Sequence, residues 1–189
     1  DYQDIEGYPP LSIKGLKSQK TDKVKIRGDV SSQYISALLM IAPKLPLGLE
    51  IELEGELGSI PYITMTIRQM EAFGVQVMAD WDKKTLSVKP QEYKAVHYKI
   101  ESDWSGASYW YAVVALAQSP ESKIELLGLK ENSLQGDSAL VEIMAQLGVK
   151  STFTENGILL EKITPAKSFK WDFTHCPDLA QTIAVILTG

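Results

Sequence analysis

The fold is decided by Val24-Lys25-Ile26-Arg27-Gly28-Asp29-Val30-Ser31-Ser32, a stretch that recurs 74 residues later as Tyr98-Lys99-Ile100-Glu101-Ser102-Asp103-Trp104-Ser105-Gly106. In both copies an alternating run typical of a strand leads through an Asp-x-Ser turn into an apolar run with helical spacing. A later part repeats with the same offset of 74 residues: Ile67-Arg68-Gln69-Met70-Glu71-Ala72-Phe73-Gly74-Val75 aligns with Val141-Glu142-Ile143-Met144-Ala145-Gln146-Leu147-Gly148-Val149. The sequence therefore predicts a duplicated supersecondary unit whose helices pack against one another.

Each unit is predicted to contain a strand, a helix, a strand, a helix and two further strands, which gives a mixed α/β (α+β) fold. In the first unit we expect strands near residues 24–28, 49–53, 75–79 and 85–89, and helices near 32–42 and 61–73. In the second unit we expect strands near 97–102, 123–127, 149–154 and 157–161, and helices near 105–118 and 135–147.

Partial units are expected on both sides of these two. Residues 1–22 are interpreted as the tail of a preceding unit, and a third copy is expected to begin at Phe169 and to enter a helix near Pro177. The chain opens with Asp1 rather than Met, and the apolar run 179–187 has no later segment to pack against. Both observations favour the interpretation that the chain is a fragment.

Composition and charge narrow the class of protein. The net charge is -5 and Lys and Arg are spread along the chain, so a nucleic-acid partner is not expected. No apolar run approaches the roughly 20 residues that a membrane helix needs, so no membrane partner is expected either. The single cysteine, Cys176, cannot form an internal disulfide, which favours a reducing, cytoplasmic location.

Ser31-Ser32-Gln33 lies where a strand meets the start of a helix. The backbone N–H groups at such a start, together with two hydroxyls and an amide, suit a phosphate or a carboxylate. The alternative is that one serine only caps the helix, and for such a pair taken alone we favour capping by about four to one.

Two further candidate stretches also stand at predicted helix starts. Pro61 suits the first turn of a helix, so Ser59 could be its cap, and Tyr62 could either direct its hydroxyl into a cleft or pack. Asp178 follows Pro177, where an acid is favoured by the helix dipole or could act as a general base. The neighbouring His175 and Cys176 predict neither a nucleophilic pair nor a zinc site, because adjacent side chains rarely meet in that geometry and no second cysteine is present.

Taken together, these stretches resemble one family, the EPSP synthases. Gly28-Asp29-Val30-Ser31-Ser32-Gln33-Tyr34-Ile35-Ser36-Ala37-Leu38-Leu39-Met40 resembles the family segment that holds shikimate 3-phosphate. Gly55-Glu56-Leu57-Gly58-Ser59-Ile60-Pro61-Tyr62-Ile63 resembles the second segment that contacts its phosphate. Further blocks match in the family's order: Tyr8-Pro9-Pro10-Leu11, Asp103-Trp104-Ser105-Gly106-Ala107-Ser108-Tyr109, Asn132-Ser133-Leu134-Gln135-Gly136-Asp137 and His175-Cys176-Pro177-Asp178. The similarity covers essentially the whole chain.

The resemblance implies the enolpyruvyl transferase fold, an inside-out α/β barrel of two lobes, each built from three β-α-β-α-β-β units about a pseudo-threefold axis. It divides the chain into the tail 1–22, a complete unit 23–98 of the N-terminal lobe, and residues 99–189 of the C-terminal lobe, with one complete and one truncated unit. The lobe boundary would lie near residues 96–101, and the full-length enzyme would be a monomer.

The resemblance also implies an activity. The family transfers the enolpyruvyl group of phosphoenolpyruvate to the 5-hydroxyl of shikimate 3-phosphate and releases phosphate, with no metal or organic cofactor. Carried over by position, the residues that would bind the shikimate phosphate are Ser31, Ser32 and Ser59. Gln33 would contact shikimate 3-phosphate beside phosphoenolpyruvate, and Tyr62 would line the shikimate pocket. Asp178 would hold the ring hydroxyls and accept a proton.

Two departures from the family pattern bear on activity. Ile60 stands where many relatives carry a basic residue. The family's N-terminal lysine, serine and arginine, its phosphoenolpyruvate-binding arginines, and the glutamate and lysines after the third copy have no counterparts in this sequence. The chain alone is therefore expected to have no measurable transferase activity.

Two alternative functions stay open at this point. A UDP-N-acetylglucosamine enolpyruvyl transferase shares the fold and the chemistry, but the Ser-Ser-Gln and Ser-x-Pro-Tyr segments disfavour it. A non-catalytic repeat module, with serines that only cap helices, is disfavoured by the ordered set of candidate residues. The choice between shikimate 3-phosphate, UDP-N-acetylglucosamine and no ligand would separate the three.

Overall fold

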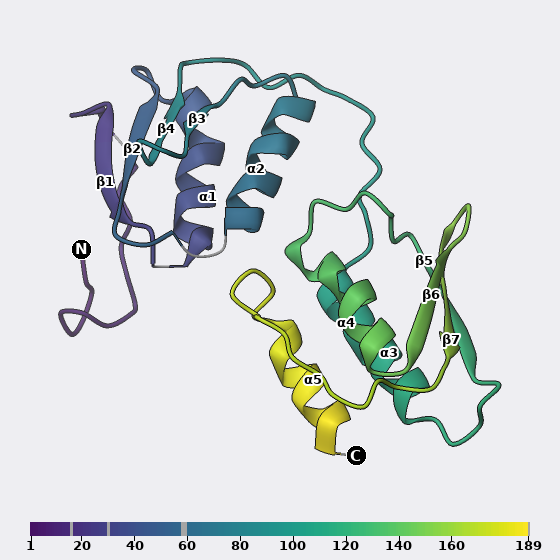
Figure 1. Cartoon of the computed structure of the whole chain (residues 1–189). Coiled ribbons are helices and arrows are strands. Elements are labelled where there is room, and N and C mark those ends of the chain that lie inside the picture. Colours follow the sequence, from purple (N-terminus) through teal and green to yellow (C-terminus); the bar gives the residue numbers. More distant parts are fainter. Residues whose placement is uncertain (16, 30, 58–59, 189) are drawn as a thin grey trace.

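The computed structural model describes residues 1–15, 17–29, 31–57 and 60–188. The first unit forms a four-stranded sheet of order β1-β2-β4-β3 (Figure 1). Its strands are β1 (Lys23–Arg27), β2 (Leu49–Glu54), β3 (Met78–Asp80) and β4 (Thr85–Val88). β1 runs parallel to β2 because a helix connects the two strands, and the other neighbours are antiparallel.

Alternation along β2 explains which face of this sheet is covered. Leu49, Ile51 and Leu53 are buried, whereas the glutamates between them face outward and pair with lysines of β1, as in the Lys23–Glu50 ion pair at 2.8 Å. The buried side of the sheet is covered by α1 (Ser32–Ile41) and α2 (Ile60–Ala72), with a short 3-10 helix, η1 (Ala42–Lys44), after α1 (Figure 1). Both helices contribute fully buried side chains to the core of this unit, including Ile35, Leu39 and Ile63.

The second unit repeats this arrangement. Its strands are β5 (Lys123–Leu127), β6 (Val149–Phe153) and β7 (Gly157–Lys162), and its helical elements are α3 (Trp104–Leu116), η2 (Gly136–Ala139) and α4 (Leu140–Gln146). The sheet order β5-β7-β6 corresponds to β2-β4-β3 of the first unit. Asp80 pairs with Thr85 in the first hairpin, and Phe153 pairs with Ile158 in the second, 73 residues further on. The predicted α/β repeat is therefore confirmed, with its offset correct to within one residue.

The last helix, α5 (Leu179–Thr188), packs against α3 of the second unit. A buried hydroxyl pair joins the two helices, with Ser108 Oγ 3.0 Å from Thr182 Oγ1. α5 begins two residues after Pro177, near the predicted helix start. Among the residues that the structure describes, no helix is both long and apolar enough to cross a membrane.

One predicted strand is wrong. Residues 97–102 make no strand ladder, because the Tyr98 ring packs on Phe73 of the first unit, with 5.4 Å between ring centroids, while Ile100 is 83% exposed. One backbone bond remains toward the second unit, from Ser102 N–H to the carbonyl of Gly128 at 3.0 Å. At the expected start of the third copy, Phe169, Trp171 and Phe173 pack onto the core of the second unit and form no strand.

Replacement of Gly157 with alanine is expected to lower the free energy of unfolding by about 1–3 kcal/mol, the usual range for an overpacked site. An added Cβ would lie 2.0 Å from the carbonyl oxygen of Leu126 and 2.8 Å from Cα of Leu127, so the β5–β7 ladder would have to shift. Urea unfolding of the purified chain measures this loss. Gly15→Ala is the matched control, since its Cβ would have no heavy atom within 4 Å. Equal stability of the two variants would contradict the close contact at Gly157.

Candidate functional site

The N-terminal ends of helices from both units face one another (Figure 1). α1 and α2 begin at the end of the first unit that lies next to the second, and α3, α4 and α5 begin at the facing end of the second unit. A helix start leaves backbone N–H groups unpaired and carries a partial positive charge, so this region favours anions. The predicted site residues that the structure describes lie at or next to these helix starts.

Ser31, Ser32 and Gln33 form the start of α1. Ser31 is the N-cap, and its Oγ accepts a hydrogen bond from the Gln33 N–H at 3.3 Å. Capping is thus a role of Ser31 in this structure, and it uses an oxygen lone pair while leaving the hydroxyl proton as a donor. Ser31 and Gln33 are exposed and Ser32 is half-buried, so two hydroxyls and an amide are accessible at one helix end.

Tyr62 lies half-buried in the first turn of α2, and its hydroxyl contacts the second unit. It donates a hydrogen bond to Oδ1 of Asp137 at 3.2 Å. Burial, followed by the charges of Asp137 and Asp178, raises the pKa of Tyr62 well above its ordinary value. The phenol therefore stays protonated and acts as a hydrogen-bond donor toward Asp137.

Asp137, in η2, is only 1% exposed and accepts bonds with both carboxylate oxygens. Tyr62 reaches Oδ1, and the Ser105 hydroxyl at the start of α3 donates to Oδ2. Burial raises the pKa of Asp137, the two hydroxyl donors oppose this, and the charges of Asp178 and Asp103 add to the rise. Asp137 is thus an acid in a place that disfavours its charge, a feature that is frequent at functional sites.

Sequence reasoning missed Asp137 as a site residue and named it only as the last residue of the matching block 132–137. The repeat itself contains a signal that could have found it. With the 74-residue offset, Asp137 aligns with Ile63, which is fully buried in the core of the first unit. A carboxylate at a position that the other copy fills with isoleucine indicates a buried acid with partners.

Asp178 lies in the turn that precedes α5 and is exposed. It contributes to the raised pKa of both Tyr62 and Asp137, so the three side chains lie within electrostatic range of one another. Gly136, next to Asp137, also lies against Pro61 and the His175 carbonyl, so the structure brings the segments of the predicted residues Tyr62 and Asp178 together around Asp137. An exposed carboxylate near a half-buried phenol and a buried acid could accept a proton from a bound hydroxyl.

The relation of the α1 start to this cluster is less direct. Among the described residues, no hydrogen bond or ion pair joins Ser31, Ser32 or Gln33 to Tyr62 or Asp178. α1 and α2 are nevertheless neighbours, since Thr66 donates to Ser36 Oγ at 2.9 Å between them. Ser59, the remaining predicted phosphate ligand, lies outside the described residues.

Other chemistry near the site has little support. Cys176 is buried, and burial raises the pKa of its thiol, which therefore stays protonated and is a poor nucleophile. Within the described ranges, no group of three or more His, Cys, Asp and Glu side chains is arranged to hold a metal ion.

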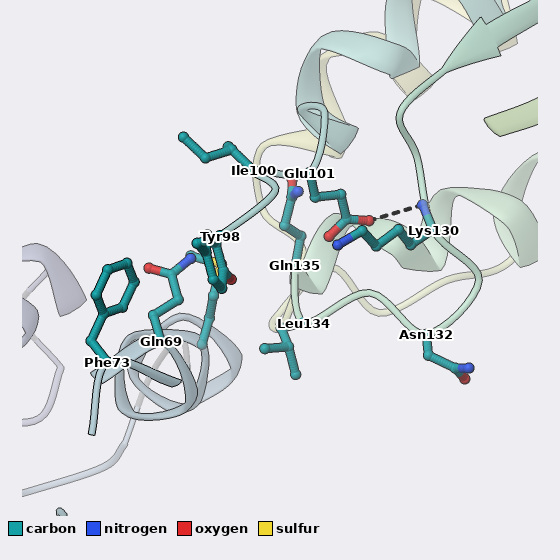
Figure 2. A pocket seen from close by; sticks show the side chains of 10 residues that line it. Gln69, Phe73, Tyr98, Ile100, Glu101, Lys130, Asn132, Leu134 and Gln135 are labelled. Atoms are coloured by element: carbon teal, nitrogen blue, oxygen red, sulfur yellow. Dashed lines mark hydrogen bonds between the residues drawn. The ribbon is translucent and has the colours of Figure 1, made fainter. Parts of the chain in front are cut away.

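A separate cavity of about 440 Å³ lies between α2 and the 130–135 loop, and Figure 2 shows residues of both units around it. None of the predicted site residues lines it. Glu101, which lines the cavity, accepts a hydrogen bond from the Lys130 N–H at 3.0 Å (Figure 2). It also accepts from Trp104 Nε1 at 2.9 Å. Together with the Tyr98–Phe73 contact, these bonds tie the connecting segment to both units.

Comparison with known proteins extends these observations. The sequence model of the family described as EPSP synthase (3-phosphoshikimate 1-carboxyvinyltransferase) matches residues 1–188. A 3-phosphoshikimate 1-carboxyvinyltransferase of Bacteroides fragilis is 46% identical over 187 residues, which are 98% of this chain and 44% of that protein. The enzyme of the same name from Pasteurella multocida is 38% identical over 186 residues, 97% of this chain and 40% of that protein. The chain therefore spans less than half the length of these relatives.

Among solved structures, an EPSP synthase from Acinetobacter baumannii is similar with a TM-score of 0.61 at 15% sequence identity. The similarity covers 98% of this chain and 42% of that one. At this identity the likeness concerns the fold alone, and it agrees with the α/β repeat predicted from the sequence.

Proposed function

Because the chain belongs to the EPSP synthase family, we propose that it forms part of an enzyme that transfers the enolpyruvyl group of phosphoenolpyruvate to the 5-hydroxyl of shikimate 3-phosphate and releases phosphate. The observation that carries the proposal is the family match over residues 1–188. The meeting of helix starts from two units supports it, because two anionic substrates need an electropositive region that neither unit encloses alone (Figure 1).

The proposal assigns phosphate binding to the start of α1. The hydroxyl groups of Ser31, Ser32 and Ser59 would donate hydrogen bonds to the phosphate of shikimate 3-phosphate, next to the unpaired N–H groups of the helix. Gln33, exposed beside them, would contact the same substrate and lie next to phosphoenolpyruvate. Tyr62 would line the ring pocket at the start of α2.

Asp178 is proposed as the proton acceptor. The 5-hydroxyl of the shikimate ring has a high pKa and needs a base close to it as its oxygen attacks the enolpyruvyl carbon. Asp178 is exposed and no described residue donates a side-chain hydrogen bond to its carboxylate, so its oxygens can meet a substrate hydroxyl. The same carboxylate would hold the ring hydroxyls in register before the reaction.

The proposal also assigns each part of the chain to a repeat unit and a lobe of the full-length enzyme. Residues 1–22 would complete a preceding unit, 23–98 would be a unit of the N-terminal lobe, and 99–189 would belong to the C-terminal lobe. The substrates would lie between the lobes, where closure orients them and excludes water. A cytoplasmic location fits this role and the free, buried thiol of Cys176.

Binding of shikimate 3-phosphate tests the proposal on the chain as it is. Titration of ¹⁵N-labelled chain is expected to give saturable amide shifts at residues 31–33 and at Tyr62. Ser32→Ala is expected to weaken binding about 10- to 100-fold, because a hydrogen bond to a charged group contributes about 1.5–3 kcal/mol.

Two controls make the result specific. Ser168→Ala changes an exposed serine outside the site and should bind like the parental chain. Unphosphorylated shikimate should give no shifts at the start of α1. Equal affinity of Ser32→Ala and the parental chain, or preference for UDP-N-acetylglucosamine, would contradict the proposal.

A further inference from the structure

Asp137 has no part in the proposed chemistry, yet it occupies the point where the two units meet. Among the residues that the structure describes, it is the only acidic side chain in the fully buried class, at 1% exposure. Burial of a carboxylate is costly unless hydrogen bonds offset it, so its two bonds define what it does. Those bonds come from different units, through Tyr62 of α2 and Ser105 of α3.

The loop that carries Asp137 has little freedom to move. At the preceding residue, Gly136, an added Cβ would lie 2.5 Å from the carbonyl oxygen of His175 and 3.3 Å from Cβ of Pro61. Gly136 is thus enclosed between the start of α2 and the segment that leads to Asp178. The position of the Asp137 carboxylate relative to Tyr62 is thus fixed by close packing of the neighbouring Gly136 against the His175 carbonyl and the Pro61 ring.

The hydrogen bond to Asp137 also determines whether the Tyr62 hydroxyl can donate to a ligand or only accept from it. A phenol has one proton and two lone pairs, and the proton of Tyr62 is donated to Asp137. Toward a ligand, the Tyr62 oxygen can therefore only accept. An acceptor at this place suits a ring hydroxyl of a bound substrate and not its phosphate, which would offer a second acceptor.

From these contacts we propose that Asp137 is a positioning residue, which holds the Tyr62 hydroxyl across the junction of the two units so that its oxygen accepts a hydrogen bond from a ring hydroxyl of the substrate. The proposal rests on the proposed binding of shikimate 3-phosphate. Asp137 itself does not touch the substrate and acts through Tyr62.

A double-mutant cycle on shikimate 3-phosphate binding tests this role. Asp137→Leu removes both acceptor oxygens and keeps the branched shape and the number of heavy atoms of the side chain, so it leaves no cavity. Asp137→Leu and Tyr62→Phe are each expected to raise the Kd about tenfold, the loss of roughly one hydrogen bond. The double variant is expected to be no weaker than either single variant, because both remove the same interaction. Asp137→Asn keeps an acceptor for Tyr62 and is expected to restore most of the affinity.

Each outcome decides the question. Multiplied losses in the double variant would overturn the proposal, since a merely structural effect of Asp137 would be independent of the Tyr62 hydroxyl. Unchanged affinity in Asp137→Leu would also overturn it. If the parental chain binds no shikimate 3-phosphate, the proposed function fails for this chain, and a readout without ligand then decides whether Asp137 holds Tyr62.

That readout is the hydroxyl proton of Tyr62, observed by NMR. In the parental chain it is expected to exchange slowly with water, because Asp137 accepts it in a half-buried place. Asp137→Leu should abolish this protection and Asp137→Asn should keep it. Protection that persists in a folded Asp137→Leu chain would show that another group holds Tyr62, and the positioning role would be wrong.

Discussion

Replacement of Asp178 with asparagine is expected to lower kcat of the proposed transferase reaction by about 10²- to 10⁴-fold, the contribution typical of a positioned general base. Asparagine has the same shape as aspartate and could still hold a ring hydroxyl, but it could not accept the proton that the proposed reaction takes from the 5-hydroxyl. Asp178 is exposed, so the substitution should leave the fold and the packing of α5 unchanged. The loss is expected mainly in kcat, with a smaller change in KM.

The assay needs a protein of the family's full length, because the chain spans 44% of its Bacteroides fragilis relative. A chimera in which this chain replaces the matching segment of that relative provides one. Asp82→Asn, an exposed acid on the turn between β3 and β4, is the matched control and should retain the parental rate. A rate for Asp178→Asn within twofold of the control would remove Asp178 from the chemistry and leave it as a helix-start residue.

Much of the fold could be predicted because the sequence contains two copies of the same unit, which can be compared with each other. Two copies with one offset give the same strands and helices, and each copy tests the interpretation of the other. The prediction failed at residues 97–102, where copy and original face different surroundings. In the first unit the equivalent strand, β1, pairs with β2. In the second unit the Tyr98 ring instead packs on Phe73 of the first unit. Periodicity contains no information on such a contact between units.

The same limit applies to the candidate site. Helix starts can be found from caps and prolines, and so Ser31 and Tyr62 lie where expected. What a side chain meets across the junction of two units depends on how those units are oriented, which no local pattern encodes. Asp137 was therefore missed, although its alignment with the buried Ile63 marked it as an acid in a core position.

Replacement of Trp104 with alanine is expected to lower the free energy of unfolding by about 3–5 kcal/mol, the range for removal of a buried tryptophan. Trp104 has no exposed surface and is one of the largest fully buried side chains of the second unit. Its ring meets Phe153 of β6 edge-on at 6.3 Å between centroids. Its indole N–H also donates to Glu101, so alanine would leave both a cavity and a carboxylate with one partner fewer.

Trp110 provides the control, because it lies on the same helix and is 53% exposed. Urea unfolding of the chain should show a small change for Trp110→Ala and a large one for Trp104→Ala. Trp104→Phe keeps one aromatic ring in the core and removes the N–H bond to Glu101 with part of the indole volume, so its comparison with Trp104→Ala shows what the remaining ring contributes. Because Glu101 also binds the Lys130 N–H and the Ser133 hydroxyl, loss of its indole partner should loosen the segment that connects the two units. Faster amide exchange at residues 98–102 in Trp104→Phe would reveal that loosening, and unchanged exchange would restrict the role of Trp104 to the core.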